Sequence, residues 1–240
     1  MTQDYQFPTE EELKQLKLTW KRYILPPIHP EGVKILAVEA VIVALLAWLW
    51  LGFLWLGAPV LVFSFYFFRN PARVTPDGET LIIAPADGVV SNIKSVRPPR
   101  ELDLGDEPMT RISIFMSVFS VHVNRSPVSG TVHKLNYRPG AFVSVADKDS
   151  EDNERQEISL IATNGQKVGC IQIAGLVARR IFCPLKEGQT LKAGEVFGMI
   201  RFGSRLDIFL PHGVYPKVKI GQSMVAGETI LADMADLETK

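Results

Sequence analysis

The 240-residue chain has little of three things: cysteine, net charge and, after residue 69, helical periodicity. Its two cysteines, Cys170 and Cys183, are too few for a disulfide framework. Their spacing is not that of zinc ligands, and no pair of histidines accompanies them in the sequence. Lys plus Arg and Asp plus Glu both number 26, so no overall charge would attract nucleic acid. We therefore expect two free thiols, no metal and no nucleic-acid partner.

What the chain does have is one long apolar run, Ile35 to Phe68, whose only charged residue is Glu39. As a single helix this run would extend about 51 Å at 1.5 Å per residue, well beyond a hydrocarbon core of about 30 Å. Its centre contains the helix breakers Gly52 and Pro59 and three of the chain's 4 tryptophans, which prefer membrane interfaces. We predict a membrane-associated helical hairpin over residues 34–68, either spanning or re-entrant; the alternative is a buried helix pair in a soluble protein.

Basic residues flank the apolar run on both sides, Lys34 before it and Arg69 and Arg73 after it. Positive charge on both sides favours both ends in the cytoplasm, which requires an even number of passes. The preceding residues, 1–33, carry a capping box and apolar side chains at helical spacing, which predict an amphipathic helix. We therefore expect an amphipathic cytoplasmic segment over 1–33, a hairpin in the cell membrane and a cytoplasmic domain over 69–240.

After Arg69 the pattern changes to short runs rich in Val, Ile and Phe, separated by Gly, Pro, Asp and Asn. Many short strands with turn signals between them are typical of an all-β sandwich or barrel. The domain over 69–240 is therefore predicted to be mainly β. The expected strands are 81–83, 88–90, 112–115, 118–122, 130–132, 156–161 and 167–173.

The C-terminal part of the chain contains an internal repeat. Lys186–Glu195 recurs 33 residues later as Lys219–Glu228, with six of ten positions identical. Such Gly-Gln and Ala-Gly-Glu turns resemble those of lipoyl and biotinyl carrier folds, in which two similar halves form a flattened β-barrel. The resemblance implies a duplicated lipoyl-like hybrid β-barrel or sandwich, and by itself it implies no chemistry.

Three polar positions stand out within apolar surroundings: Asp87 in an Ala-Pro-Ala-Asp-Gly turn, His122 after an apolar run, and Ser204 after Gly203. Taken singly, each is more typical of an ordinary turn, a core histidine or a loop. Together, Ser, His and Asp are the groups needed to activate a hydroxyl nucleophile, with the histidine as base and the aspartate fixing its tautomer. Gly203, without a Cβ, would let the Ser204 hydroxyl reach the preceding carbonyl.

These positions lie within four motifs whose order and spacing resemble the short branch of the phosphatidylserine decarboxylases, over about residues 65 to 233. The chain departs from longer family members at two positions, where Phe119 replaces a histidine and Arg205 replaces a threonine. The motifs are Phe67–Arg73, Ala84–Gly88, His122–Gly130 and Phe202–Arg205.

The resemblance implies that the chain is a pyruvoyl-dependent carboxy-lyase made as a zymogen. Ser204 corresponds to the serine that becomes the pyruvoyl cofactor, Gly203 to the residue before the cleaved bond, and His122 and Asp87 to the groups that activate the serine. Autocatalytic cleavage would give a β chain, 1–203, and an α chain, 204–240, which stay associated. The pyruvoyl group would then form a Schiff base with phosphatidylserine, which loses CO₂ to give phosphatidylethanolamine, with no external cofactor.

Several assignments stay open. Arg125, Arg179, Arg180 and Arg205 are candidates for binding carboxylate or phosphate, although ordinary solvated arginines fit equally well. The remaining histidines (His29, His133 and His212) are expected to be structural, and the acidic stretch 146–155 to be a solvated loop rather than a calcium site. The sequence does not choose between phosphatidylserine and archaetidylserine, or between a monomer and a homo-oligomer.

Three rival functions remain: a lipoyl-like carrier or adaptor anchored in the membrane without enzymatic activity, a phosphoryl carrier that uses His122, and a scaffold without chemistry. The carrier predicts a modifiable lysine at a tight turn, which the sequence does not make evident. Only self-cleavage at Ser204 separates the enzyme from all three.

Overall fold

The computed structural model describes residues 25–140, 153–175, 180–201 and 204–236. Most of the predicted amphipathic segment and of the acidic stretch therefore lies outside the described residues. The helices are α3 (Pro30–Leu49) and α4 (Leu54–Phe67), with short 3₁₀ turns at Leu51–Phe53, Arg100–Leu102 and Met234–Asp236. The strands are β1 (Leu81–Ile83), β2 (Gly88–Val96), β3 (Met109–Met116), β4 (Val123–Arg125), β5 (Gly130–Arg138), β6 (Arg155–Ala162), β7 (Lys167–Ala174), β8 (Ile181–Phe182), β9 (Thr190–Leu191), β10 (Val196–Ile200), β11 (Ser204–Leu210), β12 (Ser223–Met224) and β13 (Ile230–Asp233).

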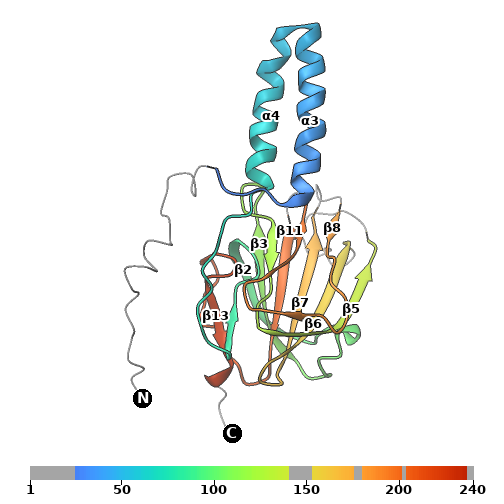
Figure 1. Cartoon of the computed structure of the whole chain (residues 1–240). Helices are drawn as coiled ribbons and strands as arrows, with labels where there is room; N and C mark the ends of the chain where they lie inside the picture. Colours follow the sequence, from blue (N-terminus) through green and yellow to red (C-terminus); the bar gives the residue numbers. More distant parts are fainter. Residues whose placement is uncertain (1–24, 141–152, 176–179, 202–203, 237–240) are drawn as a thin grey trace, which may run out of the picture.

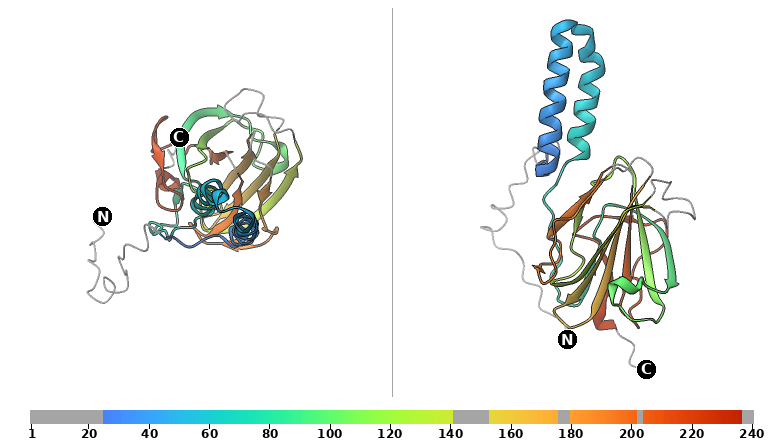
Figure 2. Two further views of the ribbon diagram at one scale, coloured as in Figure 1. Left: turned by 90° about the horizontal axis from the view of Figure 1, so that it is seen from above. Right: turned by 90° about the vertical axis from the view of Figure 1, so that its right-hand side faces the viewer.

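Helices α3 and α4 form an antiparallel pair that projects from one end of the β domain (Figures 1 and 2). By length and composition, α3 could cross a membrane. Near the far end of the pair, Trp48 and Trp55 are 84% and 86% exposed. The one charge in the apolar run is held between the two helices, where Ser64 Oγ donates to a Glu39 carboxylate oxygen at 3.0 Å. The pair thus presents an apolar surface and keeps its carboxylate partly covered.

The base of the helix pair is fixed to the β domain by backbone hydrogen bonds and a small core. The His29 N–H donates to the Phe68 carbonyl at 2.9 Å, which closes the two ends of the helical segment. Phe67 and Phe68 are buried and pack with Met199 of β10. The last turn of α4 is therefore part of the β domain's interior rather than a free linker.

The β domain is built around an eight-stranded antiparallel sheet of order β12-β2-β3-β11-β7-β6-β5-β9, which curls around its main core (Figure 1). One face of the sheet carries the large core cluster. Leu102, Leu104 and Met109 pack with Phe209 and two isoleucines of β7 in a second cluster. The prediction of a mainly β domain is confirmed, while the lipoyl-like closure stays a prediction.

One predicted strand is wrong. Residues 118–122 do not pair in a sheet; Ser117–Ser120 form a turn in which the Ser120 N–H donates to the Ser117 carbonyl at 2.9 Å. The two hydroxyls also lie 3.2 Å apart, and serine side chains of this kind stabilise turns at the expense of strands. His122 therefore follows a turn and precedes β4.

The internal repeat forms two matching corners of the domain. Gly188 and Gly221 are equivalent positions in the repeat, and each donates its N–H at 2.8 Å to a strand carbonyl, that of Val132 or Val90 respectively. The strands β9 and β12 that follow lie at the two opposite edges of the large sheet. The repeat in sequence is thus a repeat in structure.

Each corner also contains a Pro-x-x-Gly turn that the sequence alone did not relate to the other. Residues 84–88 and 126–130 are equivalent: Gly227 N–H donates to Ala84 O, and Gly194 N–H donates to Ser126 O, both at 2.8 Å. A Cβ added to Gly88 or Gly130 would collide with a carbonyl oxygen of the neighbouring strand, so both positions require glycine.

Two of the histidines expected to be structural make local contacts. His29 Nδ1 accepts the Glu31 N–H at the start of α3, and His133 Nε2 lies 2.8 Å from Asp103. Both cysteines are free thiols. Within the described ranges, no group of His, Cys, Asp and Glu side chains is suited to a metal ion.

Candidate active site

Ser204 is the first residue of β11 and is completely buried. It pairs with Met116 of β3 on one side and with Ala174 of β7 on the other. Its hydroxyl lies 3.4 Å from the Met116 sulfur, which is only a weak acceptor. Gly203 lies outside the described residues, so the hydroxyl is known to be buried and weakly bonded, and its approach to the preceding carbonyl stays a prediction.

The chain on both sides of the 203–204 junction is attached to one segment, residues 116–123. Before the junction, the Ile200 N–H donates to the His122 carbonyl at 3.2 Å, and Met199 pairs with Val123. After the junction, Ser204 pairs with Met116. The structure therefore brings the Ser204 segment and the His122 segment together.

His122 is a buried imidazole with one nitrogen engaged. Its Nδ1 lies 2.9 Å from the Ser120 carbonyl oxygen. Because a carbonyl can only accept, Nδ1 carries the proton and Nε2 keeps its lone pair. Nε2 is buried and has no hydrogen-bond partner among the described residues.

The surroundings of His122 keep it neutral. Burial lowers its pKa to about 4, the Ser120 carbonyl opposes this shift, and the positive charge of Arg69 adds to it. Phe67 from the last turn of α4 stacks on the imidazole with ring centroids 4.2 Å apart. At neutral pH the imidazole can therefore accept a proton at Nε2.

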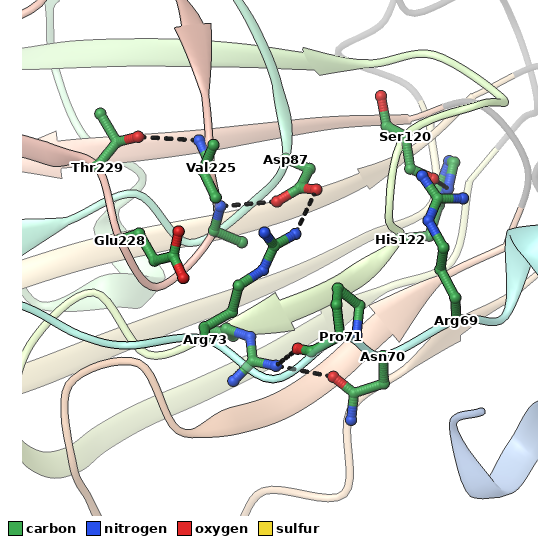
Figure 3. A network of polar contacts seen from close by, with 12 residues as sticks. Arg69, Asn70, Pro71, Arg73, Asp87, Ser120, His122, Val225, Glu228 and Thr229 are labelled. Carbon is green, nitrogen blue, oxygen red and sulfur yellow. Dashed lines mark hydrogen bonds and ion pairs between the residues drawn. The ribbon is translucent and has the colours of Figure 1, made fainter. Parts of the chain in front are cut away.

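Asp87 does not orient His122 as predicted. One carboxylate oxygen accepts from Arg73 at 2.7 Å and the other accepts the Ala226 N–H at 2.7 Å. Figure 3 shows the carboxylate directed toward Arg73, while His122 is bonded to Ser120. The physical reason is that a buried carboxylate takes the strongest donor within reach, a guanidinium, while a backbone carbonyl already fixes the imidazole tautomer.

The two partners of Asp87 do not fully offset its burial. Burial raises its pKa, and this is the largest effect; the charge of Arg73, the Ala226 N–H and the charge of Arg69 act in the opposite direction. Asp87 and Arg73 thus form a largely buried ion pair beside the segment that leads into β2. Sequence reasoning missed Arg73, although the residue lies within a motif that carried the family resemblance.

Of the four candidate anion-binding arginines, the three that the structure describes have separate environments. Arg125 donates to Gly194 O, Asn70 Oδ1 and Pro71 O at 2.8 to 3.0 Å, so it holds the chain in place. Arg205 follows Ser204 in a strand and so points to the opposite face, where it bonds Asp207 at 3.0 Å. Arg180 is exposed, and Arg179 lies outside the described residues.

Known proteins resemble this chain over most of its length. A sequence model of the family described as phosphatidylserine decarboxylase matches residues 60–232. A protein of Cereibacter sphaeroides named phosphatidylserine decarboxylase proenzyme is 52% identical over 217 residues, which cover 90% of this chain and 94% of the relative. Proteins of the same name from Ruegeria pomeroyi and Paramagnetospirillum magneticum are 51% and 50% identical over 88% and 95% of this chain, and over 96% and 94% of their own lengths.

Such a family match, with relatives at half identity over nearly whole chains, agrees with the four motifs and with the burial of Ser204 beside the His122 segment. The chain therefore belongs to the phosphatidylserine decarboxylase family and is a decarboxylase.

Proposed function

We propose that this chain is a proenzyme that cleaves itself between Gly203 and Ser204, becomes pyruvoyl-dependent and then converts phosphatidylserine to phosphatidylethanolamine. The observation that carries the proposal is that adjoining segments hold a buried, weakly bonded Ser204 hydroxyl and a buried neutral imidazole whose Nε2 lone pair is unused. The names of the relatives, which are proenzymes, support the same reading.

In the proposed cleavage, His122 Nε2 takes the Ser204 hydroxyl proton as the oxygen attacks the Gly203 carbonyl carbon. The Gly203–Ser204 C–N bond breaks, the proton passes to the released amine, and an ester joins the two residues. Loss of the Ser204 Cα proton then breaks the ester C–O bond, leaving a carboxylate on Gly203 and a dehydroalanine at 204. Water adds to the tautomeric imine, and ammonia leaves.

The surroundings of position 204 suit a pyruvoyl group. Complete burial at a strand end would protect a reactive ketone from water, and the Ser204 hydroxyl lies against a sulfur atom rather than a carboxylate. A pyruvoyl group there would bind the substrate amine and withdraw electrons as the carboxylate leaves. His122 would hold the proton needed after CO₂ departs, since Phe119 replaces the second histidine.

Asp87 is proposed as a positioning residue rather than a direct partner of His122. It holds Arg73 by a 2.7 Å ion pair and the 225–228 turn through the Ala226 N–H. The contact with Arg73 fixes the segment that follows the helix pair, which also carries Arg69 beside His122. Asp87 would still support the activation of Ser204, as the resemblance implies, but through Arg73 and the 225–228 turn rather than through His122.

We also propose that the helix pair enters the cell membrane and that the β domain lies at its cytoplasmic surface. The exposed apolar side chains of α3 and α4 and the two exposed tryptophans at the far end support this location. Full-length protein should sediment with membranes and require detergent for release; full-length protein that stays soluble without detergent contradicts the proposal.

Electrophoresis under denaturing conditions tests the self-cleavage. Purified wild-type protein should give two pieces, and Ser204→Ala should give one. Ser113→Ala is the matched control, because Ser113 is an equally buried serine on the adjacent strand β3. Wild-type protein that stays whole after long incubation would instead favour the carrier or adaptor function.

A further inference from the structure

A small cavity that the proposed cleavage does not use lies where the helix pair meets the β domain. It has a volume of about 190 Å³ and lies between the last turns of α4 and the 117–120 turn. The side chains around it are aromatic or apolar apart from one cation: Phe63, Tyr66, Phe67, Val118, Phe119 and Arg69. A pocket with apolar walls and a single positive charge favours a ligand that is both anionic and amphipathic.

Arg69 is pre-oriented at this cavity. Its two terminal nitrogens donate to backbone carbonyls, those of Tyr66 on α4 and Phe119 on the facing turn, the latter at 2.8 Å. A guanidinium has five N–H donors, so these two bonds fix the plane and leave further donors for a ligand. No carboxylate lines the cavity.

The cavity is adjacent to the proposed reaction centre. Phe67 lines the cavity and also stacks on His122 at 4.2 Å. Figure 3 shows the Arg69 side chain alongside His122, and the charge of Arg69 contributes to the lowered pKa of the imidazole. An anion bound to Arg69 would thus lie one side chain away from His122.

We infer that this cavity binds the phosphodiester of the lipid substrate, with Arg69 pairing with the phosphate and Phe63 and Phe119 contacting the adjoining glycerol and acyl carbons. The inference rests on the proposed function and names the substrate-binding group for it. Phe119 is 76% exposed at the cavity although it is a large apolar side chain, which suits contact with lipid.

The substrate carries two anionic groups, and the phosphate is the better partner for Arg69. An ion pair with the carboxylate would stabilise the ground state more than the transition state, in which that negative charge moves away from the leaving CO₂. A pair with the phosphate is the same in both states and serves only to hold the substrate. The position of the cavity at the base of the apolar helices also matches the depth of lipid phosphates at a membrane surface.

The test uses soluble dihexanoyl phosphatidylserine and its methyl phosphotriester, which lacks the phosphate charge. Wild-type enzyme should prefer the diester, and Arg69→Gln should lose roughly ten- to a hundredfold in kcat/KM for the diester, mostly through KM. The same variant should no longer distinguish diester from triester. Full discrimination retained by Arg69→Gln would overturn the inference.

Two controls separate this inference from other effects. Lys34→Gln removes an exposed cation near the base of α3 and should leave kcat/KM unchanged. If Arg69→Gln fails to fold or cleave, Arg69→Lys and competition in the wild type provide the test. Dihexanoyl phosphatidylglycerol, a phosphodiester without amine or carboxylate, should compete with substrate, and its phosphotriester should not; equal competition by both overturns the inference. Wild-type protein that is cleaved into two pieces but does not prefer the diester would contradict the phosphate site alone. Wild-type protein that stays uncleaved would contradict the proposed function.

Discussion

At one equivalent position, the two corners formed by the internal repeat bind a backbone N–H with different side chains. In the first, Asp87 accepts the Ala226 N–H at 2.7 Å; in the second, Ser129 accepts the equivalent Ala193 N–H at 3.0 Å. The flanking glycine contacts are the same in both corners. Since a serine hydroxyl satisfies the backbone donor in one corner, the fold does not require a carboxylate in the other.

The charge of Asp87 therefore has another purpose, and its second oxygen indicates which. That oxygen binds Arg73, whereas the uncharged hydroxyl of Ser129 cannot form an ion pair. The Asp87–Arg73 ion pair also holds the segment that carries Arg69 past His122. The corner with Ser129 supports structure alone, while the corner with Asp87 also holds, through Arg73, the segment that carries Arg69.

The largest effect is expected at His122, which lies beside Arg69, a residue of the segment held by the Asp87–Arg73 ion pair. His122→Ala should slow self-cleavage by about 10²- to 10⁴-fold, the usual contribution of a positioned acid-base group. His133→Ala, on β5 and outside the proposed site, should leave the rate unchanged. Time courses of cleavage on denaturing gels measure both, with thermal unfolding to show that each variant is folded; equal rates for His122→Ala and wild type would contradict the account.

Asp87→Ser makes the two corners alike and should have the second-largest effect. The serine keeps the bond to the Ala226 N–H but leaves Arg73 without its carboxylate, and losing one member of a largely buried pair costs about 3 kcal/mol. We expect lower stability and cleavage slowed by roughly ten- to a hundredfold. A variant that cleaves at the wild-type rate would show that the carboxylate has no part in the site.

Burial of His122 should also make the free energy of unfolding depend on pH. The pKa of His122 is lowered from 6.5 to about 4 in the folded protein, so between these pH values the imidazole is protonated in the unfolded chain and neutral in the folded one. Stability should therefore rise with pH across this window, by about 3 kcal/mol from His122 alone, and the gain is lost as pH falls.

The Ser204→Ala protein, which stays whole, allows this to be measured by urea unfolding in detergent at several pH values. Adding His122→Gln should remove the rise between pH 4 and 6.5, and the comparison cancels the opposing contribution of Asp87, whose pKa is raised. The same slope in both proteins would mean that His122 is not buried in its neutral form.

The smallest effect is expected at the second corner. Ser129→Ala removes one hydrogen bond to the Ala193 N–H, a loss of about 1 kcal/mol, and should leave self-cleavage unchanged. A decrease in cleavage as large as that for Asp87→Ser would mean that the two corners are functionally alike and that the comparison fails.

Local patterns in the sequence predicted the mainly β domain and six of its 13 described strands, because alternation and turn residues act over a few positions. The turn at 117–120 was missed because its valine and phenylalanine resemble a strand while two serines decide the geometry. The relation between Asp87 and Ser129 was hidden because their turns share only proline and glycine.

The partners of the candidate site residues were the least predictable part. Arg73 reaches Asp87 and Arg69 reaches the 117–120 turn because an extended segment passes these points, and nothing periodic in the sequence gives its course. The sequence named Ser204, His122 and Asp87, and their catalytic roles stay predictions; the hydrogen bonds of the last two came only from the structure.

Intact mass spectrometry of the purified protein tests the central claim most directly. We expect a C-terminal piece that begins at position 204 and is lighter by one ammonia than a peptide with an N-terminal serine, together with a piece that ends at Gly203. Active decarboxylase with a single mass for the whole, unmodified chain would contradict the account.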